Sequence, residues 1–335
     1  MDNNIDSLNV KKSLELFPEQ IREAYGQAVS SNIKTVSPLN GVVISGMGGS
    51  SNAAKILEGV YEEDFASPID IDIHNDYGLP SWVNKDSLVI ANSYSGNTEE
   101  TLSGYEEAKK RGAKVIGIST GGKIHDIVIN PKGTNPTGFP KTGLGISIGA
   151  LAGVLTKVGV LKIDEAEINS CMEELVKIRE SWNVQEKALW LNGFLPVLFG
   201  GRPLIGALNA GRNAMCEISR NYTQFYDFPE VNHVLIEATQ KPDIIKGKNR
   251  YLFFISKFNH PRVLTRYKIT KEIFNEQELS YTEYELKGTT KLVQALELAH
   301  YCSWVAYHHS ILQKSDPGPE PWITKLKDKL SQENL

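Results

Sequence analysis

The chain has 335 residues, of which 41% are hydrophobic and 23% charged, and its formal net charge is −4. The length is enough for two domains of about 100–200 residues each, and the slightly acidic charge excludes a global basic field that would attract nucleic acid. The three cysteines lie far apart without zinc-ligand spacing, so we expect reduced thiols in a cytoplasmic protein without a metal ion or cofactor. The most apolar window, residues 144–160, is interrupted by glycines and predicts a buried helix rather than a membrane span.

Strands and helices alternate along the first half of the chain. An amphipathic helix is predicted at 5–30, and residues 145–160 form another helix, rich in small side chains. Helical patterns also follow the strands that end at Ser45 and Ala91. Alternation of this kind is typical of a doubly wound parallel sheet with helices on both faces, an α/β fold of the three-layer αβα type. The predicted strands lie at 42–45, 69–74, 88–91, 115–118 and 127–129.

The second half repeats this order of elements after a helical connector, so we predict two similar α/β domains. Strands are predicted at 195–199, 251–255 and 280–286, and helices at 204–218, 262–277, 289–313 and 322–330. The predicted boundaries are 1–160 for the first domain with its N-terminal helix, 161–190 for the connector, 191–313 for the second domain and 314–335 for a closing segment.

Two loops at predicted strand ends concentrate glycines and hydroxyl groups. The first is Gly-Met-Gly-Gly-Ser-Ser at 46–51, and the second is Ser-Tyr-Ser-Gly-Asn-Thr-Glu-Glu-Thr at 93–101. The carboxyl ends of parallel strands form the ligand-binding edge of such a sheet. A helix start there offers free N–H groups and a partial positive charge, which suit a phosphate. We therefore predict a phosphate gripped from two strand ends, with Gly48 and Gly49 allowing close approach of the backbone.

Other interpretations of these loops remain open. A P-loop is excluded because the required lysine is absent. A dinucleotide fingerprint would need glycine at Ser51, although Asp70 and Asp72 lie about 20 residues further on, where a ribose-binding acid belongs. The glycines could also serve a tight turn alone. Asn97 and Glu100 have the spacing of a helix-capping box.

The two loops resemble those of the sugar isomerase (SIS) domain. In the second half, Asn-Ala-Met-Cys-Glu at 213–217, Phe-Tyr-Asp-Phe-Pro-Glu-Val-Asn-His at 225–233 and the ending from Asp316 are similar to the bifunctional phosphoglucose/phosphomannose isomerases. The resemblance covers nearly the whole chain, and Phe-Pro-Glu-x-Asn-His is its most specific part. It implies two SIS domains and an aldose–ketose isomerisation through a cis-enediol. The implied substrate is glucose 6-phosphate, with mannose 6-phosphate as a second candidate, and the product is fructose 6-phosphate.

The resemblance also implies roles for individual residues. Glu217 matches the base, and His233 matches the ring-opening residue, which the family contributes across a homodimer interface. Lys327 matches an assisting C-terminal lysine. The ordinary alternatives are a surface glutamate, a structural histidine at a helix start with Asn232 as its N-cap, and a solvated lysine. The hydroxyls that match the family's phosphate-binding groups are those of Ser50, Ser93, Ser95 and Thr98.

The chain departs from the family pattern at Lys141. The family usually carries an arginine there, positioned to stabilise the enediolate. Lysine keeps the positive charge but loses the planar two-pronged donor geometry. Ser51 likewise stands where glycine is common in the family.

Two other functions fit an SIS fold. A non-catalytic sugar-phosphate sensor would usually carry a DNA-binding segment, and the N-terminal 40 residues have neither a helix-turn-helix pattern nor a basic face. An amino-sugar phosphate isomerase or deaminase would keep both hydroxyl loops without needing Phe-Pro-Glu-Val-Asn-His. We expect a sugar phosphate as the small-molecule partner, and no binding to nucleic acid or membrane.

Overall fold

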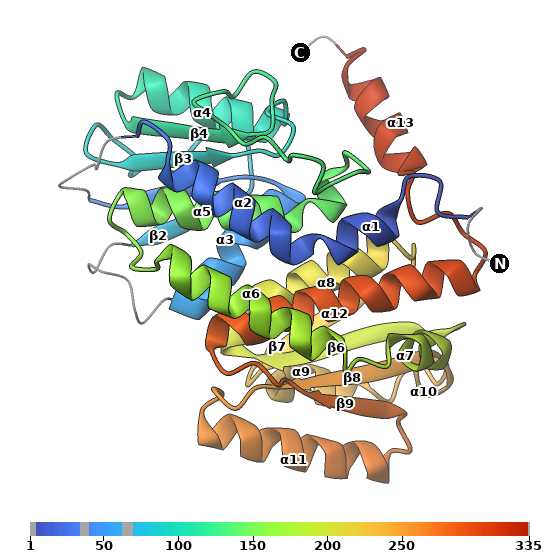
Figure 1. Cartoon of the computed structure of the whole chain (residues 1–335). Helices are drawn as coiled ribbons and strands as arrows, with labels where there is room; N and C mark the ends of the chain where they lie inside the picture. Colours follow the sequence, from blue (N-terminus) through green and yellow to red (C-terminus); the bar gives the residue numbers. More distant parts are fainter. Residues whose placement is uncertain (1–4, 34–39, 62–69, 334–335) are drawn as a thin grey trace.

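Two parallel β-sheets form the framework of the computed structural model, which describes residues 5–33, 40–61 and 70–333 (Figure 1). The strand order is β2-β1-β3-β4-β5 in the first sheet and β7-β6-β8-β9 in the second. In each sheet the chain places its second strand on one side of the first strand and its third strand on the other. The predicted α/β fold with two parallel sheets is therefore confirmed. The strands are β1 (Val42–Ser45), β2 (Ile71–His74), β3 (Leu88–Asn92), β4 (Lys114–Ser119), β5 (Ile127–Val128), β6 (Leu195–Gly201), β7 (Gln224–Phe228), β8 (Asn249–Ile255) and β9 (Tyr281–Glu285).

Helices fill the space between the sheets and cover their outer faces (Figure 1). Apolar side chains of the inner helices join those of β1 and β6 in one core that spans both sheets. The inner helices are α3 (Gly48–Tyr61), α5 (Leu144–Lys157), α8 (Ile205–Glu217) and α12 (Lys291–Leu312). The outer helices are α4 (Glu99–Lys110) on the first sheet, and α9 (Val231–Ala238) and α11 (Pro261–Glu276) on the second. The other helices are α1 (Val10–Glu15), α2 (Phe17–Val29), α6 (Glu165–Arg179), α7 (Val184–Leu191), α10 (Ile244–Lys248) and α13 (Pro321–Leu330), with short 3-10 helices η1 (Pro140–Thr142) and η2 (Arg202–Leu204).

The N-terminal segment differs from its prediction, because residues 5–30 form two helices instead of one. α1 ends at Glu15 and α2 begins at Phe17. Pro18 stands in the first turn of α2. A proline has no N–H group to continue the hydrogen bonds of a preceding helix, but it fits well at the start of a new one.

Other elements agree with their predictions to within a few residues. Of the predicted strand at 69–74, residues 71–74 form β2 and residue 69 lies outside the described part of the chain. β7 lacks the apolar run that predicts a strand, because it is an edge strand with mostly half-buried side chains. None of the helices in the described ranges combines the length and hydropathy that a membrane span requires. Where the chain divides into domains stays a prediction.

Close contact between α2 and α5 explains why the predicted helix is rich in small residues. Gly145, Gly149 and Gly153 lie four residues apart on α5, so they share one face of the helix. A Cβ atom added at Gly149 would lie 2.2 Å from the carbonyl oxygen of Ile21 on α2. The obstacle is backbone, which cannot rotate away as a side chain could. Glycine at this position therefore fixes how closely the two helices pack.

Replacing this glycine should destabilise the protein, although alanine is the better helix former. We expect Gly149→Ala to lower the free energy of unfolding by about 1–3 kcal/mol, the usual effect of overpacking. Gly26 on α2 is the matched control, because nothing lies within 4 Å of a Cβ added there. Gly26→Ala should stabilise the protein by up to about 1 kcal/mol. Urea unfolding curves measure both effects, and equal stability of the two variants would contradict the packing described here.

Candidate active site

The strand order brings the two predicted phosphate loops to the same edge of the first sheet. β1 pairs with β2 on one side and with β3 on the other, so the chain reverses its direction of winding at β1. The loops that follow β1 and β3 flank the crevice at this switch point, where open α/β sheets bind ligands. The loops are also in direct contact. The hydroxyl of Ser50 accepts a hydrogen bond from the backbone N–H of Tyr94 at 3.2 Å, and Asn92 Nδ2 donates to the Ser50 carbonyl at 3.0 Å.

The loop after β3 is held rigidly by the loop after β4. Gly96 has a φ of +66°, and a Cβ atom there would lie 1.9 Å from the carbonyl oxygen of Gly121. The backbone N–H groups of Lys123 and Ile124 both donate to the Gly96 carbonyl at 3.1 Å. These contacts require glycine at position 96 and fix the hydroxyls on either side of it.

Most of the predicted phosphate-binding residues line one cavity of about 710 Å³. Ser93 is the exception, because it is buried behind Thr98 and its hydroxyl donates to Thr98 Oγ1 at 3.0 Å. Ser93 is therefore placed to orient the Thr98 hydroxyl rather than to touch a ligand. The residues that line the cavity are Gly48, Gly49, Ser50, Ser95 and Thr98. Gly48 begins α3 with a φ of +51°.

The capping-box interpretation of the second loop is wrong. α4 begins at Glu99, and its N-cap is Thr98, whose side chain makes no capping hydrogen bond. Asn97 Oδ1 instead accepts a hydrogen bond from the N–H of Lys123 at 3.2 Å. Asn97 thus stabilises the loop and leaves the first turn of the helix uncapped by side chains, so its N–H groups stay available.

Glu217 lies in the same cavity, at the last position of α8. The pKa of its carboxyl is raised from the usual 4.5 to about 7, chiefly because burial removes water from the charged form. The negative charge of Glu320 adds to this rise in pKa, whereas the cation of Lys141 opposes it. A carboxyl that titrates near neutral pH can both accept and release a proton, which is the requirement for general acid–base catalysis.

Lys141 lies on η1, and its side chain is only 1% exposed. Its Nζ lies 3.4 Å from a carboxylate oxygen of Glu320 and donates to the backbone carbonyl of Glu217 at 3.5 Å. Burial lowers the pKa of the Lys141 amine, and the charges of Glu320 and Glu217 oppose this. A buried lysine of this kind needs a partner, and Glu320 supplies it. The Lys141 amine therefore lies at the cavity with its charge balanced by Glu320.

Lys327 also lines the cavity, from the exposed helix α13. Its positive charge lowers the pKa of Glu217, which indicates that the two groups are close enough to interact. α13 follows the proline-rich break at 316–321 and extends beside the first domain (Figure 1).

His233 does not join these residues within one chain. It lies on α9, at the outer face of the second sheet, and is exposed. It is not among the described residues that line the cavity. The expectation that Asn232 caps its helix is wrong, because α9 begins at Val231 and its N-cap is Glu230. The Asn232 side chain instead donates to the hydroxyl of Thr270 at 2.8 Å.

Glu320 and Tyr94 are among the cavity residues that the sequence prediction missed. Glu320 lies within the proline-rich break, where a single acid gives no recognisable pattern, and it contacts Lys141 only after the chain has folded. Tyr94 lies inside the second hydroxyl loop and lines the cavity with Ser95. Its hydroxyl accepts a hydrogen bond from Asn135 Nδ2 at 2.7 Å. Its position between two predicted phosphate-binding residues was the one signal in the sequence that could have identified it.

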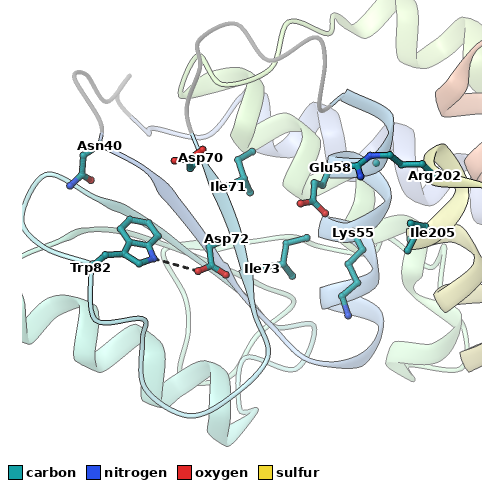
Figure 2. Close-up of a pocket in the computed structure, with 12 residues that line it drawn as sticks. Asn40, Lys55, Glu58, Asp70, Ile71, Asp72, Ile73, Trp82, Arg202 and Ile205 are labelled. Carbon is teal, nitrogen blue, oxygen red and sulfur yellow. Dashed lines mark hydrogen bonds between the residues drawn. The ribbon is translucent and has the colours of Figure 1, made fainter. Parts of the chain in front are cut away.

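A separate hollow of about 890 Å³ lies along the edge strand β2 (Figure 2). Asp70 and Asp72, the acids that a dinucleotide site would use, line this hollow and not the cavity of Gly49 and Ser50. Asp72 accepts a hydrogen bond from the indole of Trp82 at 3.4 Å, as Figure 2 shows. The arrangement therefore favours the phosphate interpretation of the glycine turn over the dinucleotide one. Within the described ranges, no three His, Cys, Asp or Glu side chains gather in a way that could hold a metal ion.

Comparisons with known proteins agree with this arrangement. Residues 40–123 match the SIS domain family, and residues 183–330 match the bacterial phospho-glucose isomerase C-terminal SIS domain family. A bifunctional phosphoglucose/phosphomannose isomerase from Caldicellulosiruptor bescii is 32% identical over 342 residues, covering 96% of this chain and 98% of the relative. One of the same name from Aquifex aeolicus is 32% identical over 311 residues, covering 89% and 93%.

Solved structures share the fold at low sequence identity. A putative tagatose-6-phosphate ketose/aldose isomerase from Clostridium novyi has a TM-score of 0.69 and 14% identity, covering 92% of this chain and 89% of that one. This likeness concerns the fold alone. The family matches and the near full-length similarity to curated relatives show that the chain is an SIS-domain protein that belongs to the family of bifunctional phosphoglucose/phosphomannose isomerases.

Proposed function

We propose that the chain interconverts glucose 6-phosphate and fructose 6-phosphate through a cis-enediol, and that mannose 6-phosphate is a second substrate. The names of these two relatives, bifunctional phosphoglucose/phosphomannose isomerases, support both hexose phosphates. The observation that carries the proposal is the Glu217 carboxyl, whose pKa of about 7 suits proton transfer, in one cavity with the two hydroxyl loops. The cavity volume of about 710 Å³ is in the range of small-molecule sites.

In this proposal the loops bind the substrate phosphate and the Glu217 carboxylate transfers the proton. The hydroxyls of Ser50, Ser95 and Thr98 and the start of α3 bind the phosphate, and this holds the sugar in register. Glu217 then removes the proton from C2 of the open-chain sugar and returns it to C1. Holding the reacting carbon beside the base supplies much of the acceleration, because the step becomes effectively unimolecular.

Lys141 stabilises the negative charge that develops on the enediolate. Its buried amine lies beside the backbone of Glu217, so the positive charge is already close to the reacting carbons. Lys327 assists from α13. Because these amines supply positive charge, the reaction needs no metal ion, and activity should persist in EDTA. Lysine offers fewer fixed donors than the arginine of the family pattern, and we expect lower activity for that reason.

His233 opens the sugar ring and reaches the site from a second copy of the chain in a homodimer. Two observations support this. The family motif contains this histidine, and in the single chain it is exposed on α9, away from the residues that line the cavity. An imidazole is suited to moving a proton near neutral pH.

Removing the base should abolish turnover without loss of folding. We expect Glu217→Gln to lower kcat for fructose 6-phosphate formation by about 10²–10⁴-fold, the usual contribution of a general base. Glutamine keeps the size of the side chain, and Glu276→Gln on the exposed end of α11 is the matched control. A coupled assay for fructose 6-phosphate measures this. Unchanged turnover would reject Glu217 as the base, and an inactive wild type would reject the function.

The pH dependence of the reaction should follow the Glu217 carboxyl. A base must be deprotonated, so kcat/KM should rise with pH through about 7 and fall roughly tenfold per unit below it. Glu320 raises the pKa of Glu217 by charge repulsion, so Glu320→Gln should move this limb to lower pH. Lys141→Met should move the limb to higher pH, because the charge of Lys141 lowers the pKa of Glu217. The substrate phosphate titrates equally in all three proteins, so the differences isolate the enzyme. Identical pH profiles of kcat/KM for the three proteins would contradict the assignment of this limb to Glu217.

Mixed dimers test whether His233 acts across an interface. Glu217→Ala and His233→Ala should each be inactive alone. After the two are unfolded and refolded together in equal amounts, activity should recover to about a quarter of the wild-type value. Half of randomly paired dimers are mixed, and each mixed dimer then has one intact site of two. Refolding Glu217→Ala with Glu217→Gln is the control and should restore nothing. If activity does not recover in a preparation shown to be dimeric, His233 does not act across the interface.

A further inference from the structure

A small polar cavity lies beside the candidate active site but plays no part in the proposed reaction. Its volume is about 190 Å³, and it lies between α3 and α8. Met47 and Gly48 line both this cavity and the larger one, so the glycine turn separates the two. Ser51, which departs from the family's usual glycine, contributes its side chain here. Its hydroxyl accepts a hydrogen bond from Asn75 Nδ2 at 2.7 Å, which leaves its own proton free to donate.

Two cationic side chains line this cavity, and none of its described lining residues is acidic. Lys55 reaches it from α3 and Arg212 from α8. Burial and the charge of Arg212 both lower the pKa of Lys55, and the charge of Glu58 opposes this in part. Figure 2 shows the amine of Lys55 directed away from Glu58 and Asp72. Two like charges in a cavity whose described lining includes no carboxylate indicate a place for an anion.

The neutral side chains of the cavity are arranged as donors. Arg212 Nη2 donates to Asn209 Oδ1, and Asn209 Nδ2 donates to Asn52 Oδ1 at 2.7 Å. Both asparagines are buried. Both hydrogen bonds point toward Asn52, so the amide N–H groups of Asn52 are the last donors in this series. The Nε of Arg212 is buried and has no hydrogen-bond partner among the described residues. A buried donor without a partner is unfavourable, so the described residues do not fully satisfy this guanidinium.

The size of the cavity limits what it can hold. Small-molecule sites for ligands as large as a sugar phosphate usually exceed about 300 Å³. A cavity of about 190 Å³ has room for a tetrahedral oxyanion with a few water molecules, each of which occupies about 30 Å³ in the liquid. Arginine and lysine together are well suited to such a group, since the guanidinium can donate two parallel hydrogen bonds and the amine supplies a point charge.

We propose that the cavity between Lys55 and Arg212 is a second anion-binding site, which takes a small doubly charged oxyanion such as inorganic phosphate. Lys55 and Arg212 bind the charge, and the side chains of Ser51 and Asn52 donate to its oxygens. The site lies on the other side of the glycine turn from the cavity of the candidate active site, and it does not depend on the catalytic roles proposed above.

Selenate, an oxyanion of the same shape with a strong anomalous signal, locates the site directly. In selenate-soaked crystals of the wild type we expect one anomalous peak between Lys55 and Arg212, and another beside Ser95. Lys55→Met should remove the first peak and keep the second, and Ser95→Ala should weaken only the second. Failure of one site is therefore distinguishable from failure of the other. Absence of a peak between Lys55 and Arg212 would overturn the proposal, as would a carboxylate of a second copy filling that space.

Calorimetric titration with inorganic phosphate tests the affinity in solution. Lys55→Met should weaken phosphate binding at this site by about 10- to 100-fold, the loss expected for one charge-assisted hydrogen bond. Lys268→Met, an exposed lysine on α11, is the matched control and should change nothing. Asn213→Asp is a second variant, which keeps Lys55 and should weaken binding through repulsion. Unchanged affinity in both Lys55→Met and Asn213→Asp would show that the anion is adventitious and would overturn the proposal.

Discussion

Desolvation of the Glu217 carboxyl is the interaction on which the proposed chemistry depends. Three separate parts of the chain create it: α8 carries the carboxylate, η1 brings Lys141 beside it, and the closing segment adds Glu320. The carboxylate also lies at the C-terminal end of its helix, where the helix dipole disfavours negative charge. No local stretch of sequence could raise this pKa alone, because residues from separate parts of the chain surround the carboxyl. The core that spans the two sheets joins these parts, and the proposed role of Glu217 depends on it.

The space that follows the first strand of each sheet, and not the strand order, explains why we assign the phosphate loops to the first sheet alone. Both sheets have the same order and so the same kind of switch point. In the first, the turn after β1 leaves Gly48 open, with nothing within 4 Å of an added Cβ. In the second, a Cβ added at Gly201 would lie 2.0 Å from the side chain of Asn259. Asn259 thus fills the corresponding space in the second sheet. Under the proposed function, the first half of the repeated fold binds the phosphate and the second half supplies the base.

Local features of this site could be predicted from the sequence, and long-range ones could not. The strands before Gly46 and Ser93 have clear apolar runs, and the glycines and hydroxyls that follow them are adjacent in sequence, so the two loops were predictable. The inward position of the Ser93 hydroxyl comes from its hydrogen bond to Thr98 in the same loop, and the pairing of Asn97 with Lys123 depends on a neighbouring loop. The contact between Lys141 and Glu320 joins residues 179 positions apart, and no local pattern reports such a distance. Resemblance to a family, and not spacing, singled out Glu217 and His233.

Proton transfer by Glu217 is the central claim, and deuterium exchange tests it most directly. Wild-type protein is incubated with glucose 6-phosphate in D₂O, and deuterium at C2 of the recovered sugar is measured by NMR. A proton carried by a carboxylate exchanges with solvent, so the account predicts deuterium at C2 with the wild type and none with Glu217→Gln. Isomerisation without deuterium incorporation would point to direct hydride transfer between the two carbons, and undiminished exchange in Glu217→Gln would assign the proton to another group. Either result would contradict the account.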